Sequence, residues 1–155
     1  MELNTTIIDK FKKLWMYYIL QSLLAAIALF VLVLVLGRDK MVVISSIGAT
    51  SFIVFAMPTA VSAKTRNVLG GHLVGLASGA IFFYTALPYF IEYPAAVGVA
   101  IFLMVALDVE HPPAAGTALA VVINEVSPPV FVAIMTSALI LSCLLYTSPS
   151  PRDRS

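Results

Sequence analysis

Long apolar runs separated by short polar stretches dominate the chain. The runs cover residues 14–37, 41–57, 67–90 and 130–143, and a further segment, 95–123, is interrupted by polar residues near its middle. A helix of roughly 20 apolar residues is needed to cross a bilayer core, and unbroken apolar runs of this length are typical of membrane helices. The pattern predicts an all-α, polytopic transmembrane helix bundle of four to five membrane segments, one of them discontinuous.

The composition agrees with a chain that lies in lipid. Of the 155 residues, 61% are hydrophobic and only 11% are charged, whereas about a quarter of the residues of a soluble domain are charged. The lipid bilayer is therefore an expected partner. A net charge of +1, without a basic patch, excludes nucleic acid as a partner. The single cysteine, Cys143, excludes an intramolecular disulfide and a multi-cysteine metal site.

We interpret residues 1–143 as one transmembrane domain. The stretch "LLYTSPSPRDRS" turns abruptly polar after an apolar run, and it resembles the read-through peptide left by sequencing adapters. We therefore expect residues 144–155 to be a non-native or disordered tail.

Basic residues predict the orientation, since short cytoplasmic loops carry an excess of Lys and Arg. The basic residues that flank the first three runs are Lys10, Lys12, Lys13, Arg38, Lys40, Lys64 and Arg66. A cytoplasmic N-terminus places five of them inside and two outside. We expect this orientation, in the cell (inner) membrane.

The interruption reads "LDVEHPPAAG" and combines ionisable residues with a break in the backbone. Proline has no N–H, and its ring clashes with the carbonyl four residues earlier, so Pro112 and Pro113 should free the carbonyls of Asp108 and Val109. We expect one helix to end near Asp108 or Val109 and a half-helix to begin near Pro113. With 13 apolar residues before the interruption and ten after it, neither half should span alone, and the whole segment either crosses or re-enters.

The new half-helix offers an anion site. The N–H groups of Ala114, Ala115 and Gly116 have no partners within that helix, and a helix N-terminus favours negative charge. Asp108 and His111 are close enough in sequence to pair, so that His111 could carry a proton or a positive charge. The alternative is that the whole stretch is a polar loop at the membrane surface.

A second group of residues lies in "KTRNVLGGHLVGLASG". Asn67 is a good N-cap for the helix of residues 67–90, with Arg66 beside it. The glycines Gly71, Gly75 and Gly79 recur every four residues and predict a face for close helix packing. His72 is either a second site histidine or an interhelical hydrogen-bonding residue. The small residues at 114–120 could meet the glycine face, which would bring His72, His111 and Arg66 together.

Three motifs in this order resemble the HPP family of small integral membrane proteins. They are "GATSFIVFAMP", "TRNVLGGH" and "EHPPAAGTAL", and the last contains the His-Pro-Pro triplet that names the family. The resemblance implies about four membrane helices and a transport role, with nitrite as the substrate of some plastid and cyanobacterial members. The chain departs from the family at "VSAKT", where a Pro-rich stretch is common.

Residues and resemblance together predict a permease for a small inorganic anion, with nitrite implied by the resemblance alone. We expect His111 to carry a proton or a charge with Asp108 as its partner, Arg66 to attract the anion, and no enzyme activity, cofactor or metal. A chain of this size should form a homo-oligomer. The residues assigned to substrate binding and transport are Arg66, Asn67, His72, Asp108, Glu110, His111, Pro112, Pro113, Ala114, Ala115, Gly116 and Thr117, and those assigned to helix packing are Gly71, Gly75 and Gly79.

Two other functions fit parts of the sequence. A membrane-embedded metal-dependent enzyme could use Asp108, Glu110, His111 and His72 as ligands, since carboxylates and imidazoles bind zinc. A non-catalytic membrane scaffold or sensor would explain the glycine face but would leave the ionisable residues without a role.

Overall fold

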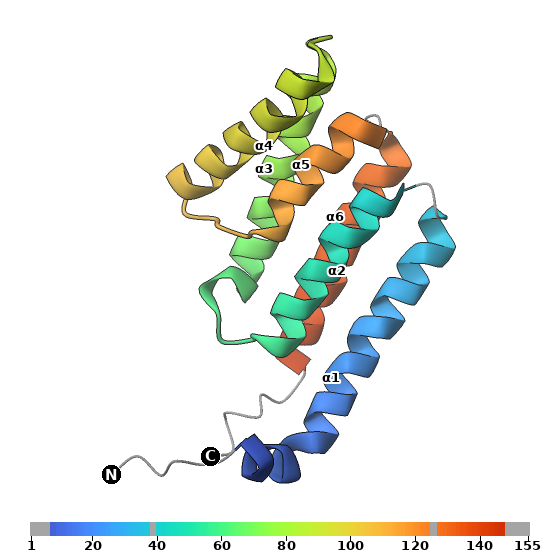
Figure 1. The fold of residues 1–155 in the computed structure, drawn as a ribbon, viewed down its shortest axis with the longest axis vertical. Helices are drawn as coiled ribbons and strands as arrows, with labels where there is room; N and C mark the ends of the chain where they lie inside the picture. The colour runs from blue at the N-terminus through green and yellow to red at the C-terminus, as the bar shows by residue number, and fades with distance from the viewer. Residues whose placement is uncertain (1–6, 38–39, 125–126, 148–155) are drawn as a thin grey trace.

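The computed structural model describes residues 7–37, 40–124 and 127–147, and the regular structure in these ranges is helical throughout. The elements are α1 (Ile7–Leu36), α2 (Met41–Ala56), the 3₁₀ turn η2 (Val61–Ala63), α3 (Thr65–Phe83), α4 (Tyr89–Ala106), α5 (Pro113–Asn124) and α6 (Pro128–Thr147). The predicted all-α bundle is therefore confirmed. Each α-helix runs roughly opposite to the one before it, with α1 and α4 at opposite edges (Figure 1).

Helix packing places α3 and α5 at the centre of one half of the bundle. α3 packs against α4, α5 and α6, while α2 packs against α1, α5 and α6 (Figure 1). The outer surface of α1 is strongly apolar, with Leu23, Phe30 and Leu34 all more than half exposed. Residues 15–36 of α1 and all of α4 are long and apolar enough to cross a membrane. An apolar surface of this extent is favourable in contact with lipid but unfavourable in contact with water.

The helix boundaries differ from the prediction around Pro88 and Pro94. α3 ends at Phe83, and α4 begins at Tyr89, so the predicted run 67–90 contains the end of one helix and the start of the next. The turn between them includes Ala86 in a left-handed conformation (φ 52°). Pro94 lies in the second turn of α4, where its missing N–H removes one intrahelical hydrogen bond, the one to the Phe90 carbonyl. The sequence did not predict this turn, because apolar residues continue from the end of α3 into the start of α4.

The expectation that neither half of segment 95–123 is long enough to span was wrong for the first half, which belongs to α4, but holds for α5. α4 has 18 residues and is therefore about 27 Å long at 1.5 Å per residue. α5, with 12 residues, is about 18 Å long and turns back along α4 (Figure 1). The segment is therefore part of a helical hairpin, and the predicted start of the second helix at Pro113 is confirmed.

The last helix is longer than predicted. α6 continues to Thr147, four residues past the predicted end at residue 143, so residues 144–147 of the expected tail are helical. The remainder of that tail, residues 148–155, lies outside the described residues.

The predicted glycine face packs against α5. A Cβ added to Gly71 would lie 2.7 Å from the Cβ of His111, and one added to Gly79 would lie 2.6 Å from the carbonyl oxygen of Ala118. At Gly75 an added Cβ would collide with the carbonyl oxygen of Ala114. The backbones of α3 and α5 are therefore in direct contact. Gly116 is an exception among the small residues, because it faces Ser46 of α2.

Candidate functional site

Helix α4 ends in a hydrogen-bonded turn that determines where the polar residues of the motif point. The Asp108 N–H donates to the Val105 carbonyl (3.2 Å), and the Val109 N–H donates to the Met104 carbonyl (2.9 Å). This is the Schellman pattern, in which the residue after the C-cap adopts a left-handed conformation. Asp108 does so with φ 55°, and Asp is one of the few non-glycine residues that tolerate this region. The turn ends α4 before the prolines are reached.

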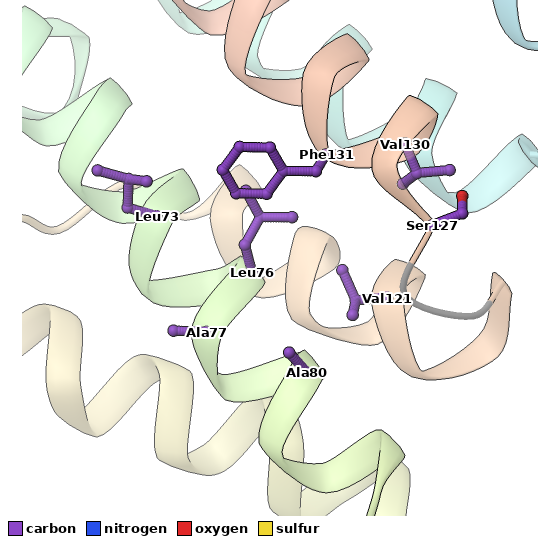
Figure 2. Close-up of a pocket in the computed structure, with 8 residues that line it drawn as sticks. All are labelled: Leu73, Leu76, Ala77, Ala80, Val121, Ser127, Val130 and Phe131. Carbon is purple, nitrogen blue, oxygen red and sulfur yellow. The ribbon is translucent and has the colours of Figure 1, made fainter.

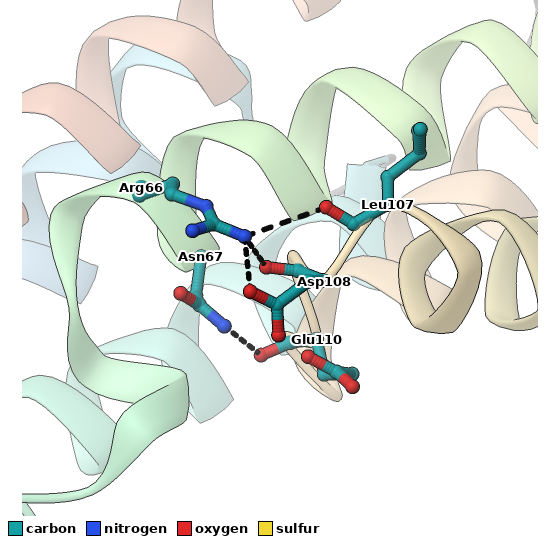
Figure 3. Close-up of polar contacts among 5 residues, drawn as sticks. All are labelled: Arg66, Asn67, Leu107, Asp108 and Glu110. Atoms are coloured by element: carbon teal, nitrogen blue, oxygen red, sulfur yellow. Dashed lines mark hydrogen bonds and ion pairs between the residues drawn. The ribbon is translucent and has the colours of Figure 1, made fainter.

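Asp108 pairs with Arg66 at the surface. Its carboxylate lies 2.5 Å from Arg66 Nη2, and the two side chains are 76% and 61% exposed. Arg66 also donates to the carbonyls of Leu107 and Asp108, as Figure 3 shows. The expected pairing of Asp108 with His111 is therefore wrong, because the Schellman turn directs the carboxylate outward while His111 turns inward.

Asn67 also has a different role from the predicted one. Helix α3 begins at Thr65 with Lys64 as its N-cap residue, so Asn67 lies in the first turn and does not cap the helix. Its side-chain amide donates to the carbonyl of Glu110 at 3.2 Å (Figure 3). Asn67 therefore holds the 107–112 turn against the start of α3.

His111 is completely buried, although it belongs to the turn. Its Nδ1 lies 2.8 Å from the carbonyl oxygen of Ser62. A carbonyl oxygen only accepts, so Nδ1 of His111 carries a hydrogen. Its Nε2 lies 3.0 Å from Thr50 Oγ1 of α2. The alternative that the whole stretch is a polar surface loop holds for Asp108 but not for His111.

His72 of α3 lies beside His111 and shares a partner with it. His72 is also completely buried, and the two ring centroids are 5.1 Å apart. Its Nε2 lies 3.0 Å from the same Thr50 hydroxyl, and its Nδ1 lies 2.8 Å from Thr117 Oγ1 of α5. The two histidines converge as predicted, with Thr50 between them. The prediction was wrong for Arg66, whose side chain is exposed and paired with Asp108.

Two further contacts extend this arrangement to the backbone of α5. Thr117 Oγ1 lies 2.9 Å from Ser46 Oγ, and Ser46 Oγ donates to the carbonyl of Pro113 at 2.7 Å. We call Ser46, Thr50, His72, His111 and Thr117 the histidine network. Its five side chains come from α2, α3, α5 and the turn before α5, and all are buried.

Sequence reasoning did not assign a role to Ser46, Thr50 or Ser62. A signal for the first two was present, since Ser46 and Thr50 are four residues apart in the otherwise apolar run 41–57, and residues at this spacing share one helix face. Ser62 contributes only its backbone carbonyl, for which side-chain identity gives no signal.

The predicted anion cradle at the start of α5 is partly occupied by protein. The N–H of Ala114 donates to the His111 carbonyl (2.8 Å), and that of Ala115 donates to the Pro112 carbonyl (3.2 Å). Ala114 is fully buried as well. These two amides are therefore not free to bind an anion, because the turn that begins α5 uses them.

Two hollows border α5, and they differ in the residues that line them. One, of about 250 Å³, is lined by Glu110, His111 and Pro112 and by four residues of α4 and α5, Ile101, Met104, Val105 and Ala115. The other, between α3, α5 and α6, is lined almost entirely by apolar side chains, with Ser127 at its rim (Figure 2). Both hollows have mainly apolar surfaces, and only the first has ionisable residues, Glu110 and His111, among those that line it.

The four residues considered as metal ligands do not gather at one point. His72 and His111 are buried in the bundle, whereas Asp108 is exposed and paired with Arg66. Within residues 7–37, 40–124 and 127–147, no three His, Cys, Asp or Glu side chains form a group that could hold a metal ion.

Substitutions of Asp108 should separate its backbone role from its charge. We expect Asp108→Asn to change the free energy of unfolding by less than about 1 kcal/mol, because exposed ion pairs contribute little and Asn tolerates the left-handed region. Asp108→Val should destabilise the protein by about 1–2 kcal/mol, since a β-branched residue is strained in the left-handed region. Thermal unfolding in detergent micelles measures both, and equal losses would show that the ion pair matters more than the turn.

Comparison with known proteins gives one match. Residues 10–150 match the family model described as the HPP transmembrane region. Neither a curated protein nor a solved structure matches the chain. The matched range includes the Arg66–His72 stretch, the hydroxyl-bearing face of α2 and the whole α4–α5 hairpin. The chain therefore belongs to the HPP family of integral membrane proteins, which is generally a family of membrane transport.

Proposed function

We propose that this protein is a permease that carries a small inorganic anion across the membrane together with a proton. The histidine network is the observation that supports it. Two histidines buried in a membrane bundle are costly to place there, and intramembrane ionisable residues are functional candidates by default. The network also lies where the α4–α5 hairpin is interrupted, and broken helices form the substrate sites of many transporters.

An anion is the ligand that best complements a protonated histidine at this position. A charged imidazolium is unfavourable in a low-dielectric interior unless a counter-charge accompanies it. Asp108 does not supply that charge, because its carboxylate is exposed and paired with Arg66. An anion in the hollow beside His111 would supply it. Proton and anion should therefore bind together, so that the pair crosses with no net charge.

The hollow is of a suitable size for a small anion. Its volume of about 250 Å³ exceeds the roughly 30 Å³ that one water occupies in the liquid, so a triatomic anion and a few waters would fit. Nitrite is the substrate that the family resemblance favours. Arg66, at the same end of the bundle, would raise the local concentration of anions.

Orientation and assembly follow from charge and size. The start of α3, to which Lys64 and Arg66 belong, lies at the end of the bundle where α1 begins (Figure 1). The excess of basic residues at this end favours a cytoplasmic location, in the cell (inner) membrane. The hollow beside His111 opens between α4 and α5 at the edge of the bundle. A second copy packed against α4 would close it, so we propose a homo-oligomer.

Uptake into proteoliposomes tests this function. We expect one member of a panel of nitrite, nitrate, bicarbonate, formate and chloride to enter, and an inward proton gradient to stimulate its uptake. Protein-free liposomes control for leakage of the neutral acids. Absence of uptake from protein shown to be folded would contradict the transport function, and uptake insensitive to the gradient would contradict proton coupling.

The two other functions explain less of the structure. A metal-dependent enzyme needs its ligands at one point, and the four expected ligands are divided between interior and surface. A scaffold or sensor accounts for the glycine face but leaves the histidine network without a use. Neither gains a specific supporting observation.

A further inference from the structure

The histidine network forms a line of hydrogen-bonding contacts that ends on a carbonyl at both sides. From one end, the line joins the Ser62 carbonyl, His111, Thr50, His72, Thr117, Ser46 and the Pro113 carbonyl through six contacts of 2.7–3.0 Å. Each contact needs one hydrogen between its two heavy atoms. Because both terminal groups are carbonyl oxygens, neither end can supply a hydrogen.

The neutral side chains supply too few hydrogens for this line. Each hydroxyl of Ser46, Thr50 and Thr117 has one hydrogen, and each neutral imidazole has one. These five hydrogens face six contacts. A further contact of 3.1 Å from Thr50 Oγ1 to the Ser46 carbonyl competes for the same hydroxyl hydrogen. In the neutral state at least one buried contact therefore brings two acceptors together, which is unfavourable.

We propose that the histidine network is a binding site for one excess proton, which His72 and His111 share through the hydroxyl of Thr50. With the proton on His111, its Nε2–H donates to Thr50, and Thr50 donates to Nε2 of His72. Transfer to His72 forms a new O–H bond at Thr50 from the His111 proton, while the original Thr50 hydrogen passes to His72 Nε2. All six contacts hold a hydrogen before and after the transfer.

A second proton is disfavoured by electrostatics. It would turn the Thr50 hydroxyl toward the Ser46 carbonyl and fill every contact, but it would place two positive rings with centroids 5.1 Å apart. Like charges at this separation repel strongly in a buried site. The pair therefore behaves as one site with one proton, and its titration belongs to the pair and not to either ring.

The groups that hydrogen-bond to the histidine pair are hydroxyls and a backbone carbonyl, and none of them is charged. α2 contributes the hydroxyls of Ser46 and Thr50, α5 contributes Thr117, and the η2 turn contributes the Ser62 carbonyl. On the side of α4, Met104 and its apolar neighbours face His111 across the hollow, and Glu110 is the titratable residue that shares its lining. Glu110 is therefore the group to neutralise in a control.

Shared protonation gives the proposed transport cycle a route for its proton. The proton could pass between His111, which borders the hollow, and His72, which faces Thr117 inside the α3–α5 contact. The inference deepens the proposed function and rests on it for this use alone, since proton binding can be measured without any transport.

Histidine nitrogen NMR tests the proposal directly. The chain has only two histidines, so protein with ¹⁵N-labelled histidine and a tag free of histidine shows these two rings alone. We expect both rings to change in a single step as the pH falls from about 8 to about 4, a range that spans histidine titration. Each ring should show partial imidazolium character, with a total of one proton for the pair.

Variants at position 50 identify the relay. Thr50→Val removes the hydroxyl at nearly constant shape, and we expect the charge to settle on one ring while the other stays neutral. Thr50→Ser keeps the hydroxyl and should keep the shared step, as should Glu110→Gln, which removes the nearby carboxyl group.

Several results would overturn the proposal. They are two full and independent protonations in the unaltered protein, a proton held by one ring alone, no protonation of either ring in this range, or a shared step that persists in Thr50→Val. A shared step without anion uptake would instead remove the proposed transport function and leave the proton site standing. Anion uptake without a shared titration step would remove the shared proton site and leave the transport function standing.

Discussion

Replacing His111 by alanine is expected to abolish proton-stimulated anion uptake. The substitution removes the ring that borders the hollow and breaks the contacts with Thr50 and Ser62. It leaves the partly buried Ser62 carbonyl without this donor, at a cost of up to about 1–3 kcal/mol in stability. Uptake into proteoliposomes, measured with equal amounts of folded protein, should fall to the level of protein-free liposomes.

A second variant separates loss of the proton site from loss of structure. In His111→Asn the side-chain amide can donate to the Ser62 carbonyl in place of Nδ1, but it cannot take up a proton at neutral pH. We expect this variant to fold with near-normal thermal stability and still to lose gradient-stimulated uptake. If His111→Asn transports like the unaltered protein, His111 does not carry the proton.

Gly75→Ala is expected to have the largest effect on stability of any single methyl addition in the bundle. The new methyl group would meet the backbone carbonyl of Ala114 and would lie 3.2 Å from the Cβ of Thr117 in the same helix, α5. A backbone atom cannot rotate away as a flexible side chain can, so α3 and α5 would have to separate. Overpacking of this kind costs about 1–3 kcal/mol. Separation of the helices would also lengthen the contact between His72 and Thr117.

Gly98 provides the matched control for this prediction. It is also a glycine inside a helix, but an added Cβ at Gly98 meets nothing within 4 Å. Gly98→Ala should leave the stability unchanged or raise it by up to about 1 kcal/mol, because alanine is the better helix former. Thermal unfolding of both variants in the same detergent measures the difference. Equal stability of the two would contradict the close contact of α3 with α5.

The sequence was sufficient for features that depend on neighbouring residues. Apolar runs predicted membrane helices because each run must satisfy its own backbone hydrogen bonds in lipid. The two prolines predicted the start of α5 at Pro113, since proline is favoured in a first helical turn. The four-residue glycine spacing predicted the close contact with α5, because residues three or four apart lie on one helix face.

Features that depend on residues distant in the chain required the tertiary structure. Asp108 pairs with Arg66, 42 residues away, because the left-handed turn at Asp108 directs its carboxylate to the start of α3. No local pattern distinguishes that partner from His111, three residues along the chain. The start of α4 was missed for a related reason, since the apolar composition continues across the turn between α3 and α4.

The histidine network combines both kinds of information. Composition alone indicated that His72 and His111 are exceptional, because ionisable side chains are rare within apolar membrane segments. The hydroxyl that joins them belongs to Thr50, which is 22 residues from His72 and 61 from His111. These atoms come within hydrogen-bonding distance because α2 and α3 both pack against α5 in the folded bundle. The sequence thus determined which residues must be buried and bonded, while the packing of the helices decided which partners they bond.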